Sequence, residues 1–273
     1  MDKSIIIFDM DGTILNTLED LTDSCNYILA KYECPLRSLE EIRSFVGNGI
    51  PKLIERAFGN CANCDLLKTA TKEFIDYYED HSTIKTSPYE GIIELIKKLK
   101  SDGFVIAVNT NKIETAAIDL CDKYFPNLFD IISGSKDSLP PKPAPDGIYE
   151  ILNKANINKE NAIFIGDSDV DLQTGFNAGL EVIGVSWGFK GIEFLKEKGA
   201  KDVYIACTHP VFSGPAVERL EASCAKEVVV TDTIYLPEEK RFEKLHIASV
   251  SELLAHTIKN IEETKPVSEV FEI

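Results

Sequence analysis

Apolar and polar residues follow two different spacings along the chain, and the order of these spacings predicts the fold. Short apolar runs are typical of buried strands, whereas helical spacing fills the segments between them, as in GIIELIKKLKSDG (91–103). The apolar runs cover residues 4–9 and 104–110, a shorter stretch at 130–132, and parts of NAIFIGDSDVD (161–171) and EVIGVSW (181–187). Strands that alternate with helices roughly every 25–35 residues predict a parallel sheet with crossover helices.

Residues 17–86 interrupt this alternation, because they show helical spacing without a clear strand. LEDLTDSCNYILAKY begins the stretch, KTATKEFIDYYEDH ends it, and SLEEIRSFVGNGIPKLIERAF between them starts with a Ser-x-x-Glu capping box at Ser38 and Glu41. The segment lies between the first strand and the remaining ones. It is therefore predicted to be an inserted helical domain.

Polar side chains that could take part in catalysis or binding follow three of the predicted strands, and one more lies in a loop. The carboxyl ends of the strands line the ligand crevice in such sheets, so these side chains are expected to converge on one crevice. They are Asp9 and Asp11 after the first strand, Thr110 and Asn111 after the second, Asp167 and Asp171 near the end of NAIFIGDSDVD, and Lys142 in a loop between two prolines.

The residue types suggest phosphoryl transfer assisted by a metal. Asp9 and Asp11 at alternate positions are expected to face the same way and to repel, which a divalent cation would relieve. Asp9 suits the role of a nucleophile at phosphorus, and Asp11 can give and take the proton. Thr110 and Lys142 can hold phosphoryl oxygens, and Asp167 with Asp9 makes a hard oxygen site suited to Mg²⁺.

Composition limits the partners and the compartment. A net charge of −16 argues against nucleic acid and against an anionic membrane surface, and no apolar run is long enough to span a bilayer. Seven scattered cysteines and the absence of a signal-peptide pattern favour a reducing cytoplasm. Cys61 and Cys64 have metal spacing but lack a second pair, so loop thiols are favoured over a zinc or redox site.

The motifs FDMDGT (8–13), VNTNK (108–112), PPKPAPD (140–146) and GDSDVD (166–171) together resemble those of the haloacid dehalogenase superfamily of phosphatases. More narrowly, DGTILNTLEDL, SFVGNGIPKLIERAF, YEGIIELIKKLKSDG and VSWGF resemble the phosphoglycolate phosphatase branch. The resemblance covers about residues 4–198. It implies an α/β fold with a doubly wound parallel core at 1–16 and 87–198, and a helical cap at 17–86.

The same resemblance implies a role for each site residue. Asp9 would be the nucleophile that forms an aspartyl-phosphate, and Asp11 the acid/base that also offers its backbone carbonyl to Mg²⁺. Asp167 would be the remaining metal ligand, while Asp171 would orient the metal's waters or Lys142. Gly12, Thr110, Asn111 and Lys142 would bind the phosphoryl group. Asn16, at the hinge into the cap, departs from the aspartate of many members.

The substrate is expected to be a small phosphorylated metabolite, and residues of the cap are expected to determine which one binds. Lys52 or Arg56 of the cap would meet a substrate carboxylate or, equally, pair with neighbours on the helix surface. A phosphatase of the phosphoglycolate type is favoured. A sugar-phosphate phosphomutase and a nucleotide-binding regulatory protein stay open as alternatives.

The segment 199–273 departs from this family. THPVFSGPA (208–216), VVVTDTI (228–234), SVSELLA (249–255) and the terminal VSEVF (267–271) resemble the C-terminal end of phosphoribosyl diphosphate synthetase, so the chain is interpreted as a fusion with a junction near 195–203. Strands at 203–207, 227–231 and 246–250 and helices at 215–222 and 251–262 predict half of a doubly wound, phosphoribosyltransferase-like domain. Its strands are expected either to extend the phosphatase sheet or to leave an open edge for a homodimer.

Overall fold

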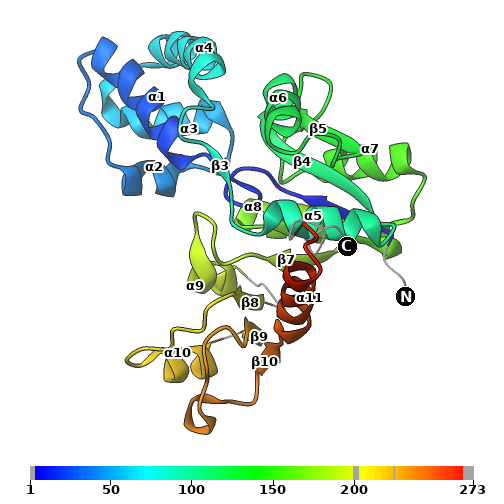
Figure 1. Cartoon of the computed structure of the whole chain (residues 1–273). Coiled ribbons are helices and arrows are strands. Elements are labelled where there is room, and N and C mark those ends of the chain that lie inside the picture. The colour runs from blue at the N-terminus through cyan, green and yellow to red at the C-terminus, as the bar shows by residue number, and fades with distance from the viewer. Residues whose placement is uncertain (1–3, 199–202, 224, 267–273) are drawn as a thin grey trace. The chain divides into compact units, whose positions relative to one another are not determined.

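The computed structural model describes residues 4–198, 203–223 and 225–266, and its contacts divide the chain into two compact units, Met1–Ala200 and Lys201–Ile273 (Figure 1). The expected junction at 195–203 falls partly outside the described residues, and VSEVF at 267–271 falls wholly outside them. The domain boundary at 198/199 therefore stays a prediction. Each unit is described by itself below.

The first unit is built on a parallel sheet with the strand order β7-β6-β1-β4-β5. Helices follow the strands as crossovers, so the predicted α/β architecture is confirmed. The strands are β1 (Ile5–Phe8), β4 (Val105–Ile113), β5 (Ile131–Ser135), β6 (Ala162–Gly166) and β7 (Glu181–Gly184), and the helices are α5 (Ile92–Ser101), α6 (Glu114–Tyr124), α7 (Asp146–Ala155), α8 (Asp169–Ala178) and α9 (Gly191–Glu197), with a 3₁₀ turn, η2 (Lys159–Asn161).

The central strand β1 is buried on both faces, which explains why it reads as an uninterrupted apolar run. Ile6 and Phe8 belong to one hydrophobic cluster, and Ile5 and Ile7 belong to another. Successive side chains of a strand point to opposite faces, so β1 contributes to the cores on both sides of the sheet. This double burial fixes the register of β1, and with it the place where Asp9 leaves the strand.

The inserted residues form a helical cap, as predicted. The chain enters it through β2 (Leu15–Asn16) and leaves through β3 (Ser87–Pro88), and these two short strands pair antiparallel. The expected capping box is present. The Ser38 hydroxyl accepts from the backbone N–H of Glu41, and the Glu41 carboxylate accepts from the backbone N–H of Ser38. The cap helices are α1 (Leu18–Lys31), α2 (Leu39–Phe45), α3 (Ile50–Phe58) and α4 (Cys64–His81), with a 3₁₀ turn, η1 (Gly59–Cys61).

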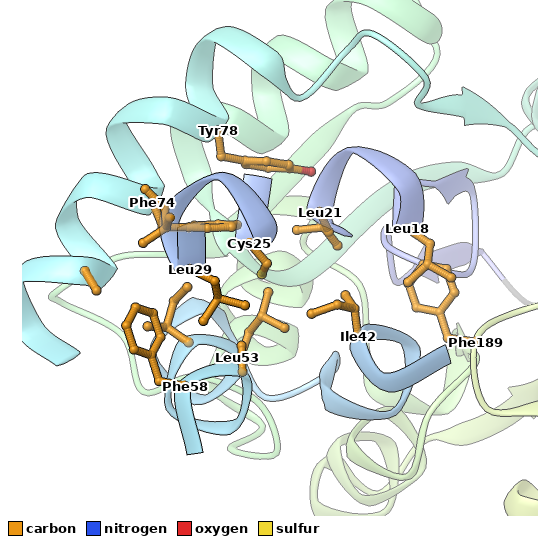
Figure 2. Packing of buried hydrophobic residues seen from close by; sticks show 14 residues of the cluster. Leu18, Leu21, Cys25, Leu29, Ile42, Leu53, Phe58, Phe74, Tyr78 and Phe189 are labelled. Atoms are coloured by element: carbon orange, nitrogen blue, oxygen red, sulfur yellow. The ribbon is translucent and has the colours of Figure 1, made fainter. Parts of the chain in front are cut away.

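The cap has a hydrophobic core of its own, which holds its helices as one body (Figure 2). Phe58, Phe74 and Leu29 are among its fully buried members, and Phe189, from the segment after β7, belongs to the same cluster. The two chain crossings are also tied together, because the buried Asp20 carboxylate accepts from the backbone N–H groups of Lys85 and Thr86 at 3.0 and 2.8 Å. None of the described helices is both long and apolar enough to cross a membrane.

In its described residues, the second unit contains a small parallel sheet with the order β8-β9-β10, together with the α-helices α10 and α11. Val228 and Val230 of β9 are buried in its core with Phe212 and Leu236. Its elements, β8 (Val203–Cys207), α10 (Ala216–Ala222), β9 (Ala225–Thr231), η3 (Glu238–Lys240), β10 (Leu245–Ala248) and α11 (Ser251–Glu262), lie close to the predicted ranges.

Candidate active site

The carboxyl edge of the first unit's sheet opens into a cleft that faces the cap. Six of the predicted site residues line this cleft, so the expected convergence is confirmed for them. They are Asp9, Asp11, Thr110, Asn111, Lys142 and Asp167. Cap residues on α1, α3 and α4 complete the walls, among them Leu21, Leu53 and Tyr78.

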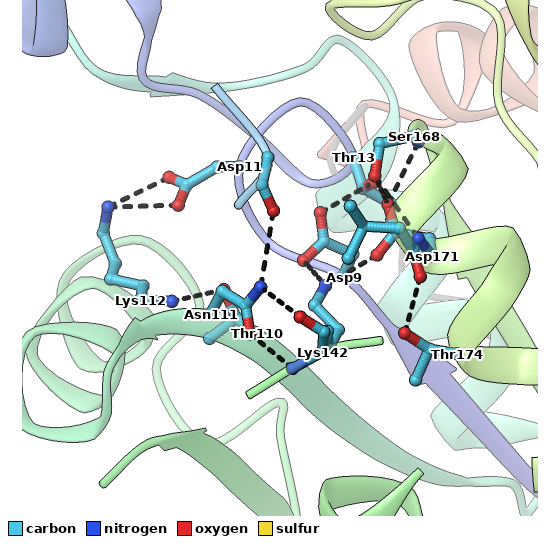
Figure 3. Close-up of polar contacts among 12 residues, drawn as sticks. Asp9, Asp11, Thr13, Thr110, Asn111, Lys112, Lys142, Ser168, Asp171 and Thr174 are labelled. Atoms are coloured by element: carbon cyan, nitrogen blue, oxygen red, sulfur yellow. Dashed lines mark hydrogen bonds and ion pairs between the residues drawn. The ribbon is translucent and has the colours of Figure 1, made fainter. Parts of the chain in front are cut away.

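Three buried carboxylates lie close together at the cleft. Figure 3 shows two of them, Asp9 and Asp171, on either side of Lys142. Asp9, Asp167 and Asp171 each offer an oxygen within 4.8 Å of the others. The Lys142 ammonium lies 2.6 Å from Asp9 Oδ1 and 2.6 Å from Asp171 Oδ1. Among the described residues this is the one acidic or thiol cluster with the geometry to hold a metal ion.

The electrostatics of this cluster favour the binding of additional positive charge. Burial, reinforced by the nearby Asp171 carboxylate and opposed by Lys142, raises the pKa of Asp9 to about 7. Burial and the Asp171 charge also raise the pKa of Asp167 well above its ordinary value. Burial alone would lower the pKa of Lys142, but Asp171 and Asp9 outweigh it and raise that pKa. One ammonium cannot neutralise three carboxylates, and hard oxygen donors suit Mg²⁺, so these residues fit the expected ion.

Local backbone structure holds the two carboxylates that follow β6. Ser168 and Asp171 form a capping box at the start of α8, in which Asp171 Oδ2 accepts from the Ser168 backbone N–H at 3.0 Å and from its hydroxyl at 2.6 Å. Asp167 Oδ2 accepts from the backbone N–H of Phe189 at 2.6 Å. The segment after β7 therefore positions Asp167 and also places Phe189 in the core of the cap.

Gly188 should not tolerate a side chain, because a Cβ there would overlap the Asp167 side chain and the Gly12 carbonyl oxygen. We expect Gly188→Ala to cost about 1–3 kcal/mol of unfolding free energy, measured by urea denaturation, and to weaken the phosphatase activity expected from the sequence as well. Gly103→Ala is the control, since its Cβ meets nothing within 4 Å and carries only the cost of a positive φ of 86°. Full activity and unchanged stability in Gly188→Ala would contradict this packing.

Asn111 connects the loop that carries Lys142 to β4. Asn111 Oδ1 accepts from the Lys142 backbone N–H at 2.7 Å, and its amide group donates to the carbonyl oxygens of Lys142 at 3.1 Å and of Gly47 at 3.3 Å. The side chain thus positions Lys142 and reaches a cap loop. The expected contact of Asn111 with the phosphoryl group stays a prediction, as does that of Gly12.

Asp11 departs from the expectation that it faces the same way as Asp9. β1 ends at Phe8, so Asp11 lies beyond the strand, where the two-residue alternation no longer applies. Its carboxylate instead forms an ion pair with Lys112 at 3.0 Å, and Figure 3 shows it turned toward that lysine. Asp171, expected only to orient waters or Lys142, contributes the third carboxylate of the acidic cluster.

Lys112 was missed from the sequence, although a signal was present. Lys112 directly follows Thr110 and Asn111 near the carboxyl end of β4, the edge of the sheet expected to line the crevice. A lysine at this position is a candidate for the same cleft, and all three residues line it.

The cap lysine and arginine suggested for a substrate carboxylate are not among the residues that line the cleft. Lys52 pairs with Glu55 at 2.6 Å, and Arg56 donates to Phe45 O and Asn48 Oδ1, which is the surface pairing considered as the alternative. Lys190 lines the cleft, where burial lowers its pKa. Cys61 and Cys64 are exposed free thiols in the cap.

Comparisons with known proteins give two family matches along the chain. The family model described as haloacid dehalogenase-like hydrolase matches residues 6–185, and the model described as phosphoribosyl synthetase-associated domain matches residues 184–272. The phosphoglycolate phosphatase of Mesorhizobium japonicum is 34% identical over 196 residues, which cover 69% of this chain and 85% of that protein.

A crystal structure of a protein from Lactobacillus delbrueckii subsp. bulgaricus superposes with a TM-score of 0.72 at 32% identity, covering 74% of this chain and 94% of that one. Ribose-phosphate pyrophosphokinase 2 of Enterococcus faecalis is 55% identical over 78 residues, which cover 29% of this chain and 24% of that enzyme. The chain therefore belongs to the haloacid dehalogenase-like hydrolases and carries a phosphoribosyl synthetase-associated domain after its hydrolase domain.

Proposed function

We propose that this haloacid dehalogenase-like phosphatase hydrolyses a small phosphomonoester, with phosphoglycolate as the first candidate, through a phosphoryl group carried on Asp9. The observation that carries the proposal is the position of Asp9. Its carboxylate is buried directly after the central strand, borders the cleft and lies 2.6 Å from Lys142. The similarity to a phosphoglycolate phosphatase supports the choice of substrate.

The chain's own residues supply the steps of such a reaction. An oxygen of Asp9 attacks the phosphorus, and the new O–P bond forms as the bond to the ester oxygen breaks. Asp11 gives a proton to the departing oxygen and then takes one from the water that attacks the aspartyl-phosphate, as the bond between phosphorus and Asp9 breaks and phosphate leaves. The Thr110 hydroxyl and the Lys142 ammonium bind phosphoryl oxygens, and Asp171 holds Lys142 at 2.6 Å.

Asp9 and Asp167 would hold Mg²⁺, together with the backbone carbonyl of Asp11. The ion, when bound, offsets the negative charge of the carboxylates and of the phosphoryl group. The raised pKa of Asp9 and of Asp167 supports this assignment, because both groups lack sufficient positive charge from the protein alone.

The proposal is tested with a panel of phosphorylated metabolites assayed for phosphate release with Mg²⁺. Phosphoglycolate is expected to release phosphate and glycolate. An isomerised sugar phosphate without free phosphate would instead indicate a phosphomutase. Tight nucleotide binding without turnover of any substrate would favour the regulatory alternative.

The second unit should have no phosphoribosyl diphosphate synthetase activity. Its relative from Enterococcus faecalis is matched over only 24% of its length, and the hydrolase domain occupies the rest of this chain. We expect no AMP from ATP and ribose 5-phosphate in a preparation that releases phosphate from phosphomonoesters. AMP formation that depends on ribose 5-phosphate would contradict this prediction.

We propose that the second unit has a role in association, as a homodimer contact. Leu254, Ile258 and Ile261 are spaced along α11 and are 55–62% exposed, a pattern that a partner surface would cover. Removing residues 203–273 should lower the number of chains per particle, which is the mass measured by light scattering divided by the mass of one chain, and leave phosphate release within about twofold. An unchanged number of chains per particle would overturn this role.

A further inference from the structure

The Lys112 side chain links the segment after β1, the central sheet and the cap. It lies on β4, and its side chain is 4% exposed. Its ammonium lies 3.0 and 3.2 Å from the two Asp11 carboxylate oxygens and donates to the Tyr78 hydroxyl at 3.2 Å. It also lies 4.8 Å from the centre of the Tyr78 ring, which belongs to cap helix α4.

These contacts occupy all three N–H donors of the Lys112 ammonium. An ammonium has three N–H donors, and here they face two carboxylate oxygens and one phenol oxygen. Tyr78 is itself buried against Phe74 in the core of the cap, so its hydroxyl is held in place. A buried charge with fixed partners on both sides holds those partners in one arrangement, because breaking any contact leaves the charge uncompensated.

The arrangement places the Asp11 carboxylate on the cap side of the cleft. Asp9 is held by Lys142, whereas Asp11 is held by Lys112, and all four residues line the same cavity. Phosphate transferred to Asp9 leaves the rest of the substrate in the space toward the cap, which Tyr78 and Leu53 also line. Asp11 is thus fixed on the side where the leaving oxygen must depart.

We infer that Lys112, supported by Tyr78, is a positioning residue that holds the Asp11 carboxylate toward the leaving group; this inference rests on the proposed function. Lys112 transfers no proton and touches no phosphoryl oxygen in this role. Its loss frees Asp11 to rotate, so phosphoryl transfer to Asp9 slows for an ester whose leaving oxygen needs a proton, and hardly changes for an ester with a good leaving group.

The test compares esters whose leaving groups differ in their need for a proton. An alkyl phosphate releases a poor leaving group, whereas p-nitrophenyl phosphate releases a phenolate that needs little help. For Lys112→Met we expect kcat/KM for the alkyl ester to fall by about 10²-fold, and kcat/KM for the aryl ester to change by less than about threefold. KM for the alkyl ester should stay within about threefold of wild type, so the loss lies in kcat.

Tyr78→Phe provides a milder variant that keeps the ring and removes one hydrogen bond. We expect the same selectivity between the esters, with a fall of roughly three- to tenfold for the alkyl ester. Lys136→Met is the matched control, since Lys136 is a partly buried core lysine paired with Glu114 and Glu150 and does not line the active-site cleft. Lys136→Met should leave the ratio of kcat/KM between the alkyl and aryl esters unchanged.

Equal losses on both esters in Lys112→Met and Tyr78→Phe would overturn the inference, because they would indicate a general structural role. If Lys112→Met does not fold, the ratio of the two esters in Tyr78→Phe decides the question alone. Failure of the proposed function is distinguishable, since the wild-type protein would then release no phosphate from either ester.

Discussion

Asp9→Asn is expected to abolish phosphate release, with a fall in kcat of more than about 10³-fold and an intact fold. An amide oxygen is a far weaker nucleophile than a carboxylate, and no neighbouring carboxylate among the described residues is positioned as Asp9 is, directly at the end of the central strand. Asp169→Asn is the matched control, because Asp169 lies two residues from Asp167 and does not line the cleft. Activity above about a hundredth of wild type in pure Asp9→Asn protein would contradict the nucleophile assignment.

The same variant should be more stable than wild type in metal-free buffer at neutral pH. Folding raises the pKa of Asp9 from its ordinary value of 3.8 to about 7, so between these values the folded state binds more protons than the unfolded state. Stability from this group is therefore present at low pH and is lost as the pH rises toward 7. When both proteins are melted in EDTA, the melting temperature should fall less between about pH 5 and about pH 8 for Asp9→Asn than for wild type.

Removal of the metal should lower phosphate release by about 10³-fold or more, and added Mg²⁺ should restore it. Asp9, Asp167 and Asp171 hold an excess of buried negative charge that would repel a phosphate ester without a cation. Ca²⁺ is expected to inhibit, because it accepts more ligands at longer distances and tolerates a different geometry at Asp9.

The measurement is phosphate release in EDTA, after metal analysis has established that the protein is metal-free. Circular dichroism serves as the control that the fold persists without metal. Full activity of verified metal-free protein would refute the assignment of the acidic cluster to Mg²⁺.

The sheet and the location of the site could be predicted from local patterns. β1 reads as a buried run because both of its faces are covered, and the residues after β1, β4 and β6 converge because parallel strands share a carboxyl edge. The capping box at Ser38 was visible because its two side chains are three residues apart. Each of these features depends on neighbours in sequence or on sheet topology.

The partner of Asp11 could not be predicted in the same way. Lys112 lies 101 positions from Asp11, and their contact depends on how the chain turns after β1 and on the burial supplied by α4 of the cap. Likewise, the hydrogen bond from Phe189 to Asp167 depends on the path of the segment after β7. Contacts of this kind join residues far apart in the chain, so no sequence spacing predicts them.

The most direct test of the proposed mechanism is the identity of the residue that carries the phosphoryl group during turnover. Wild-type protein is mixed with Mg²⁺ and an aryl phosphate, quenched in acid within milliseconds, reduced with borohydride and digested. We predict that mass spectrometry finds homoserine in place of aspartate at position 9, the product of reducing an acyl phosphate there, and finds none in Asp9→Asn. Reduction at another aspartate, or turnover with no reducible acyl phosphate, would contradict the mechanism.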